Sequence, residues 1–515
     1  MTIWKRIKQR LGFGKRAYAG ARIGRLTSDW TTAVSSANAE IKGDLQSLRA
    51  RARQLERDND YVRRYLKALE NNVLGAGGIK FQAKSKDSNG LFDTFANNKI
   101  EDAWREWGRA TNCTTTGRQS FIDVQRLILR SVARDGSVMI RKVRGFDNPF
   151  RFSLQVLESD LLDIEYNHTL QNGNTVRMGI ELNEWEQPVA YHLLNGHVGD
   201  EYGMSRPTKR ERVLADEIIM PFITERPHQV IGVPWLVSAM YRLNMLAGYE
   251  EAEVTAARVA ACKMGFYTKQ EASEGYQGEQ DASGNLLTNA EAGAFEELPV
   301  GTDFRAFDPQ HPNGQYGQFI KGCLRGISAG LGISYNSLAN DLEGVNYSSI
   351  RAGLLEEREE WKSIQNWFID AVMQPVFDEW LNYALLSGAL NLPAAKYDKF
   401  STIEWKPRRW AWVDPMKDTQ ANVIAVANGF KSRQGIISEA GGDIEDVLDE
   451  IAADNQLAES KGVELNADRA SEFGGCTSGY LSRNDPANNE RDDYCNDDGP
   501  HHTPLDDSEF SQLSE

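Results

Sequence analysis

The most informative stretch of this chain is residues 326–386, which read GISAGLGISYNSLANDLEGVNYSSIRAGLLEEREEWKSIQNWFIDAVMQPVFDEWLNYALL. It joins a helix rich in small residues, a polar loop of Asn, Asp and Gly, and a long amphipathic helix. Pro375 interrupts the long helix, and because proline removes a backbone hydrogen bond it predicts a kink there. No catalytic triad, phosphate-binding loop or metal-ligand cluster accompanies the stretch. We therefore predict that two helices present a polar loop within a structural assembly.

The three parts of this stretch have separate sequence signals. A helix is predicted over 316–333, where Gly326, Gly330 and Gly332 favour close contact with a neighbouring backbone. The polar loop spans 334–348 and is rich in turn-forming residues. The long helix is predicted from about 349 to 386. Its apolar stripe consists of Ile350, Leu354, Trp361, Ile364, Phe368, Val372, Val376 and Trp380.

Another long helix is predicted from Pro234, because proline favours the first helical turn and about thirty residues follow without another. At 1.5 Å per residue it would reach ~45 Å. Its second half, 247–261, is rich in Ala and Gly. Such small side chains suit a barrel of closely packed stems, although the high helix propensity of Ala explains them equally simply. Residues 265–315 are predicted as a β insert, with strands at 265–269 and 303–309.

The N-terminal third mixes helices with strands. Ser120 and Asp123 form a capping-box signature at the start of one helix. The predicted elements are helices over 44–74, 98–109 and 120–135, a strand over 79–83, and several strands between 137 and 194. A strand over 401–412 and compact helices over 415–462 come later in the chain. The fold class that we predict is α+β.

Charge is distributed very unevenly. The chain of 515 residues has a net charge of −16, yet residues 439–515 alone hold 21 acidic and 4 basic residues. The rest is therefore close to neutral, and the segment beyond 466 is predicted to be disordered. Residues 1–28 hold eight cations and no acid, which is typical either of a solvated arm or of a segment that contacts nucleic acid or an acidic partner.

Several function classes lack support. Five cysteines at long spacings indicate reduced thiols, and Cys476, Cys495, His501 and His502 lack the close pairs of a zinc site. The P-loop and H-E-x-x-H motifs are missing from the sequence. No apolar run follows the N-terminal charges as in a signal peptide, and none is long enough to span a bilayer. We predict no enzymatic activity, no cofactor, no metal site and no membrane insertion.

Six passages, in order, resemble the lambda-type family of portal proteins from tailed bacteriophages. They are LRARARQLERDNDYVRRYL, SVARDGSVMIR, VPWLVSAMYRLNMLAGYEEAEVTAARVAACKMGF, LPVGTDFRAFDPQHPNGQYGQFIK, LRGISAGLGISYNSLANDLEGVNYSSIRAGLLEER and WKPRRWAWVDPMKD. The resemblance covers about 29–462. It implies a ring, usually of twelve subunits, at one capsid vertex, with a central DNA channel for packaging and ejection.

The resemblance also implies a division of the chain into the parts of the portal fold. These parts are a basic N-terminal arm at 1–29, a wing at 30–232 with a return strand at 391–414, stem helices at 233–264 and 316–333, a clip at 265–315, a tunnel loop at 334–348, a long kinked helix at 349–390, a crown at 415–465 and an acidic disordered tail at 466–515. The resemblance says nothing about the tail.

The resemblance implies a passive mechanism in which a packaging ATPase, the terminase large subunit, docks on the clip and pushes double-stranded DNA through the channel. We expect four tunnel-loop residues to face the duplex: Asn340, Asp341, Asn346 and Tyr347. Plain turn chemistry is the alternative explanation for these four residues. Other implied partners are further copies of the chain, head-completion or connector proteins, and the major capsid and scaffold proteins. The implied location is the virion, with assembly in the host cytoplasm.

One other function class remains open at this point, and a second lacks support. A DNA-binding or scaffold module would act through the basic N-terminal arm and the Arg-rich helix over 44–74, and its DNA affinity would depend on salt. A membrane pore would need alternating apolar strands or a membrane-length helix, and the sequence offers neither.

Overall fold

The computed structural model describes residues 21, 25, 28–197, 199, 209–261, 265–268, 295–298, 314–343, 347–410, 415–439, 442 and 444–462. Two compact units are present, Met1–Gly441 and Gly442–Glu515. Most of the predicted arm (1–29), the predicted strand at 303–309 and the predicted tail (466–515) lie outside the described residues.

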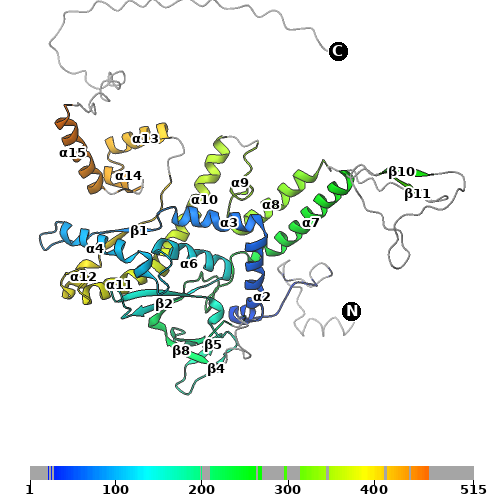
Figure 1. The fold of residues 1–515 in the computed structure, drawn as a ribbon, viewed down its shortest axis with the longest axis horizontal. Helices are drawn as coiled ribbons and strands as arrows, with labels where there is room; N and C mark the ends of the chain where they lie inside the picture. The colour runs from blue at the N-terminus through cyan, green and yellow to red at the C-terminus, as the bar shows by residue number, and fades with distance from the viewer. Residues whose placement is uncertain are drawn as a thin grey trace, which may run out of the picture. The chain divides into compact units, whose positions relative to one another are not determined.

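The helix predicted over 44–74 is in fact two helices and a π-helical turn. Helix α2 (Ala37–Asp58) begins after the N-cap Ser36, and α3 (Asp60–Leu69) begins after Asn59, whose side chain accepts the backbone N–H of Val62 (Figure 1). The apolar stripe continues across this break, so periodicity alone gave no sign of it. A π-helical turn, Glu70–Leu74, then leads to Gly75 at φ 71°.

Arginine side chains fix α2 to the body of the first unit. Arg49 is 1% exposed and donates to the backbone oxygen of Asp135 and to the carboxylate of Asp160. Arg53 donates to the Asp135 carboxylate at 2.8 Å. Because a buried charge is tolerated only when it is paired, these contacts strongly determine where α2 lies.

The main core is aromatic and lies where α4 (Thr94–Trp107), α6 (Phe121–Asp135) and α11 (Gln374–Leu386) meet. Trp104, Trp107, Phe121, Phe377 and Trp380 contact one another with ring centroids 4.8–6.3 Å apart. Helix α5 (Ala110–Cys113) is a single turn between α4 and α6. The predicted capping box of Ser120 and Asp123 is confirmed at the start of α6.

The strands predicted over 79–83 and between 137 and 194 are confirmed, and the predicted strand over 401–412 is shorter, Ile403–Lys406. They form separate small sheets. Strand β1 (Lys80–Ala83) pairs antiparallel with β12 (Ile403–Lys406), more than 300 residues later. One antiparallel sheet has the order β3-β2-β9 and another the order β4-β5-β6-β7-β8. Their strands are β2 (Met139–Arg144), β3 (Phe152–Leu157), β4 (His168–Thr169), β5 (Thr175–Arg177), β6 (Ile180–Leu182), β7 (Pro188–Leu194), β8 (Arg210–Leu214) and β9 (Ile218–Ile219). The α+β class predicted from the sequence is confirmed.

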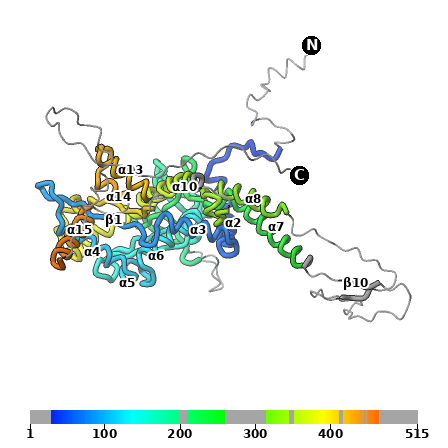
Figure 2. Tube along the Cα trace, turned by 90° about the horizontal axis from the view of Figure 1, so that it is seen from above, coloured from blue at the N-terminus to red at the C-terminus, as the bar shows by residue number. Residues whose placement is uncertain are grey.

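Helices α7 (Val237–Ala261) and α8 (Tyr316–Leu331) lie side by side (Figures 1 and 2). Close backbone approach is confirmed at Gly330, whose carbonyl accepts the hydroxyl of Ser238 at 2.7 Å. Gly332 has a different role from the one predicted. It caps α8 in the left-handed region at φ 67°, and a Cβ added there would have no neighbouring atom within 4 Å. In the part of the chain that links α7 to α8, β10 (Gly265–Thr268) pairs in parallel with β11 (Phe295–Leu298).

The long helix near the predicted kink changes its winding. Helix α10 (Tyr347–Phe368) passes into a π-helical turn, Ile369–Met373, and then into α11. The turn ends at Met373, two residues before Pro375, which lies in the first turn of α11. The apolar residues on both sides of the turn stay buried.

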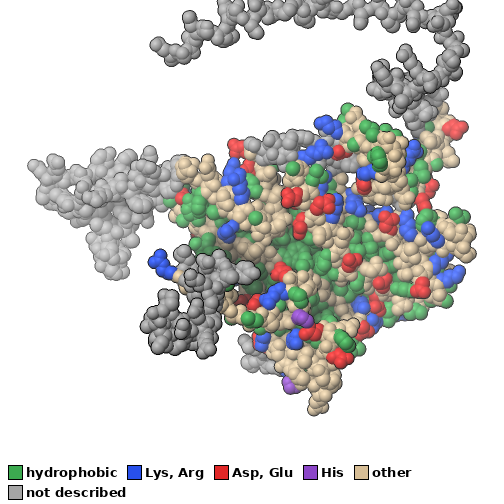
Figure 3. All heavy atoms as spheres, turned by 180° about the vertical axis from the view of Figure 1, so that it is seen from behind, with side chains coloured by type: hydrophobic (Ala, Val, Ile, Leu, Met, Phe, Trp, Pro, Cys, Tyr) green, Lys and Arg blue, Asp and Glu red, His purple; other side chains and the backbone are tan. Residues whose placement is uncertain are grey.

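Shorter helices complete the described chain. In the first unit these are α12 (Tyr397–Phe400), α13 (Pro415–Ala427) and α14 (Arg433–Glu439), and Arg351 of α10 contacts Asp418 of α13 at 3.2 Å. In the second unit the described helix is α15 (Ile444–Ser460). On the face seen in Figure 3, acidic and basic side chains are interspersed around a hollow of apolar side chains.

Candidate functional site

The segment predicted as an open polar loop contains a short helix, α9 (Tyr335–Ala339). Ser334 caps it by accepting the backbone N–H of Ser337 at 3.2 Å. Leu338 is 2% exposed and fixes the helix to the core. Asn340 ends the helix at φ 53°, a left-handed conformation that Asn tolerates better than most side chains. The sequence pattern suggested only turns here because five residues are too few for a helical period.

Asp341 connects the segment to α8. Its carboxylate accepts the hydroxyl of Tyr335 at 2.7 Å and the backbone N–H of Glu343 at 3.0 Å, and it lies 3.2 Å from Nζ of Lys321. The Tyr335 hydroxyl first, then the Glu343 N–H and the Lys321 ammonium, lower the pKa of Asp341 to about 2. Burial, and then the Asp341 charge, raise the pKa of Tyr335 to about 12. The carboxylate is therefore ionised and already partnered at neutral pH.

Two further contacts fix α9 from its other sides. The Ser337 hydroxyl donates to the carboxylate of Glu357 on α10 at 2.9 Å, and Glu357 is 7% exposed. The guanidinium of Arg64 on α3 donates to the Ser337 carbonyl at 3.0 Å. Helices α3, α8 and α10 thus all contact this segment, so its described part is positioned by side chains distant in sequence.

The four predicted site residues differ in where they lie and in what they contact. Asn340 is exposed at the end of α9, whereas Asp341 is engaged with Lys321 and Tyr335. Asn346 lies outside the described residues, and Tyr347 begins α10, with only its backbone described. Sequence reasoning missed Lys321 because it lies twenty positions before Asp341, on a helix whose orientation the pattern left open.

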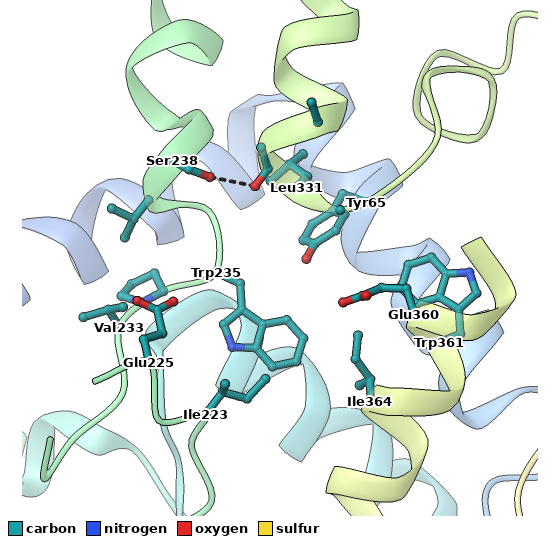
Figure 4. A pocket seen from close by; sticks show the side chains of 15 residues that line it. Tyr65, Ile223, Glu225, Val233, Trp235, Ser238, Leu331, Glu360, Trp361 and Ile364 are labelled. Atoms are coloured by element: carbon teal, nitrogen blue, oxygen red, sulfur yellow. Dashed lines mark hydrogen bonds between the residues drawn. The ribbon is translucent and has the colours of Figure 1, made fainter. Parts of the chain in front are cut away.

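A cavity of about 500 Å³ lies beside this segment, between α3, the start of α7, the end of α8 and α10. Figure 4 shows the side chains of Tyr65, Trp235 and Ile364 around it, with Glu225 and Glu360 from opposite sides. Both carboxylates belong to exposed residues. The cavity is apolar inside and has acidic side chains at its edge.

Within the ranges that the model describes, no group of His, Cys, Asp and Glu side chains could hold a metal ion. None of the helices in those ranges is both long and apolar enough to cross a membrane. Cys476, Cys495, His501 and His502, whose spacing argues against a zinc site, lie outside the described residues. In the described residues, charged and hydrogen-bonded contacts position the loop.

Comparison with known proteins identifies the family. Residues 23–365 match the model of "Phage portal protein, lambda family". The chain is 36% identical over 468 residues to a probable portal protein of Halomonas phage phiHAP-1, covering 90% of each chain. This chain belongs to the lambda family of phage portal proteins. The resemblance inferred from six sequence passages is thereby confirmed.

More distant members align over similar lengths. Portal protein B of Escherichia phage lambda is 20% identical over 492 residues, covering 88% of this chain and 92% of that protein. Among solved structures, the neck of an empty GTA particle computed with C6 symmetry matches with a TM-score of 0.39 and 13% identity, covering 78% of this chain and 94% of that one. The neck of a native GTA particle computed with C12 symmetry gives 0.38 and 13%. Likeness at this level does not by itself establish a shared arrangement.

Proposed function

We propose that this chain assembles into a ring around a central channel, through which phage DNA enters the capsid during packaging and leaves during ejection. The observation that carries the proposal is the family match over residues 23–365, together with 36% identity to a phage portal protein over 90% of the chain. The role is structural, and a packaging ATPase supplies the work.

The chemistry of the tunnel loop supports this function. Residues 334–348 contain no Lys, Arg or His, so the loop adds no cation to the channel wall. Each phosphate that a protein neutralises releases counterions and strengthens binding, which would slow a sliding duplex. Asp341 is held by Lys321, and exposed Asn340 and Leu342 present an uncharged surface beside it.

Within this proposal, we assign the portal parts to the helices and strands described above. Helices α7 and α8 form the stem of each subunit, and α10 with α11 forms the long helix behind the tunnel loop. The wing comprises 30–232 and 391–414, the clip 265–315 and the crown 415–465. The clip receives the terminase large subunit before packaging and head-completion proteins afterwards, at the capsid vertex. Major capsid and scaffold proteins surround the wing during assembly in the host cytoplasm.

The first test is the mass and shape of the purified protein, by light scattering and negative-stain microscopy. A ring of twelve chains of 57.7 kDa has a mass of roughly 690 kDa and a central hole. A monomer or dimer at every concentration, and also in the presence of capsid protein, contradicts the proposal.

The loop is tested by replacing residues 340–346 with seven Gly and Ser residues. This replacement spares buried Leu338, so α9 keeps its anchor in the core. We expect rings to form as in the wild type, while the yield of nuclease-protected DNA falls. Wild-type packaging by the variant would show that the loop has no role in DNA passage.

A further inference from the structure

A basic groove of about 650 Å³ lies between α2, α3 and α6, lined by Glu56, Arg57, Arg63, Arg64, Leu66, Lys67 and Arg130. Some of these cations are engaged within the chain: Arg130 contacts Glu70 at 2.6 Å, and Lys67 contacts the same carboxylate at 3.4 Å. The exposed guanidinium groups of Arg57 and Arg63 contact no acid among the described residues. The groove therefore offers two cations for an external partner.

The cavity beside Trp235 has the complementary charge. Its lining residues include Glu225 and Glu360 and no Lys, Arg or His. Neither carboxylate pairs with a cation among the described residues, and both residues are exposed. The indole of Trp235 lies between them in Figure 4 and is only partly buried. An aromatic face with two carboxylates nearby suits a guanidinium group, which can stack on the ring and pair with the acids.

The groove and the cavity lie on opposite flanks of one helix, α3. Tyr65 lines the cavity, whereas Arg63 and Lys67 line the groove. Two residues along an α-helix turn by about 200°, so Tyr65 leaves α3 on nearly the opposite side from each of these cations. Because α3 separates them, one subunit cannot close its own groove onto its own cavity.

We propose that the basic groove of one subunit docks against the acidic edge of the Trp235 cavity on a second copy of this chain. Arg57 and Arg63 of one copy meet Glu225 and Glu360 of the next. This inference rests on the proposed ring. Two different, complementary surfaces on opposite flanks of α3 can form a head-to-tail interface between copies, the type that closes rings. Opposite charges also fix the register of such an interface.

Two charge-reversed variants test the contact. The groove variant carries Arg57→Glu and Arg63→Glu, and the cavity variant carries Glu225→Arg and Glu360→Arg. Each alone places like charges across every interface, so we expect subunit association to weaken at least about tenfold. An equimolar mixture can alternate the two variants so that every interface again joins opposite charges. We expect the mixture to recover rings that contain both variants in a one-to-one ratio.

The control is Arg109→Glu with Arg118→Glu, which changes the net charge equally at two exposed arginines outside the groove. Thermal melting of each variant separates misfolding from lost association, and recovery on mixing shows directly that both variants fold. Particle mass from light scattering is the readout.

Other occupants of the groove predict different results. If the groove variant forms normal rings but loses affinity for duplex DNA, the groove binds phosphate and the proposal is wrong. If it forms normal rings and residues 463–515 become more sensitive to protease, the acidic tail occupies the groove and the proposal is wrong. Failure of the mixture to assemble also overturns it. If the wild type itself forms no rings, the proposed function fails first.

Discussion

The junction between α6 and α7 yields a sharp prediction, because two glycines meet there through their backbones. A methyl group added at Gly232 would overlap the carbonyl oxygen of Gly136 and lie 2.7 Å from Cβ of Phe222. Helix α7 begins five residues later, at Val237, and the N–H of Trp235 donates to the carbonyl of Ala133 near the end of α6. Gly232→Ala should therefore disturb the point from which the stem helix departs.

The expected cost can be worked from these contacts. The Gly136 backbone and Cβ of Phe222 cannot move aside as the end of a flexible side chain could. The backbone segments that carry Gly136 and Gly232 must therefore separate by roughly 1 Å. Overpacking of this kind costs about 1–3 kcal/mol, and two rigid neighbours place Gly232→Ala near the upper end, at about 3 kcal/mol. Gly136→Ala should cost at least as much, because its φ of 86° adds backbone strain of about 1–2 kcal/mol.

Gly43→Ala is the matched control. Gly43 lies within α2, is exposed, and has no atom within 4 Å of an added methyl group. Replacing an exposed helical glycine by alanine should stabilise the protein by about 1 kcal/mol. Urea unfolding at one fixed protein concentration, followed by tryptophan fluorescence, measures all three variants. If Gly232→Ala unfolds within about 0.5 kcal/mol of wild type while Gly43→Ala is stabilised, the steric reasoning is wrong.

Three other predictions concern buried or partnered polar groups. Gln365→Leu leaves the carbonyls of Val73 and Arg408 without their donor, so the free energy of unfolding should fall by about 2–4 kcal/mol in urea titrations. The pKa of Glu181 is lowered to about 2, and the hydrogen bond from Arg212 is the largest cause. The stability from this pair should be complete above pH 4.5 and decline as the pH falls toward 2, and Arg212→Met should flatten that decline in acid-unfolding curves. Tyr335→Phe removes the hydroxyl that donates to Asp341, which is the largest cause of the low Asp341 pKa. Because this contact anchors the segment, limited proteolysis at 340–346 should become severalfold faster. Unchanged cleavage would contradict the anchoring role of Tyr335.

Local signals in the sequence predicted the structure well where a few neighbouring residues decide it. The capping box at Ser120 and the close approach at Gly330 are both present. The break at Asn59 was missed because a helix that restarts with its own cap keeps the same apolar stripe. The π-helical turns were missed because apolar residues three or four positions apart continue across them, as in an α-helix.

The candidate site shows what single-sequence reasoning could not supply. The loop itself was found from its composition, but its contacts come from three helices that lie far apart in the chain. The pairing of Asp341 with Lys321 depends on how α8 and α9 pack, and that of Ser337 with Glu357 on where α10 returns. Residue spacing carries no information about such distances until the core has been built.

The length of α7 has a consequence for newly made subunits. The α8 helix begins at Tyr316, which stacks on Tyr249 of α7, so the turns of α7 beyond Glu250 extend past their neighbour within the described part of the chain. Side chains described there are exposed or half-buried. Since a short helix without tertiary contacts is only marginally stable, the backbone amides of these turns should exchange rapidly with deuterium in free subunits. Their protection from exchange should rise with protein concentration. Amide exchange at the end of α7 therefore reports whether a subunit has associated with other subunits.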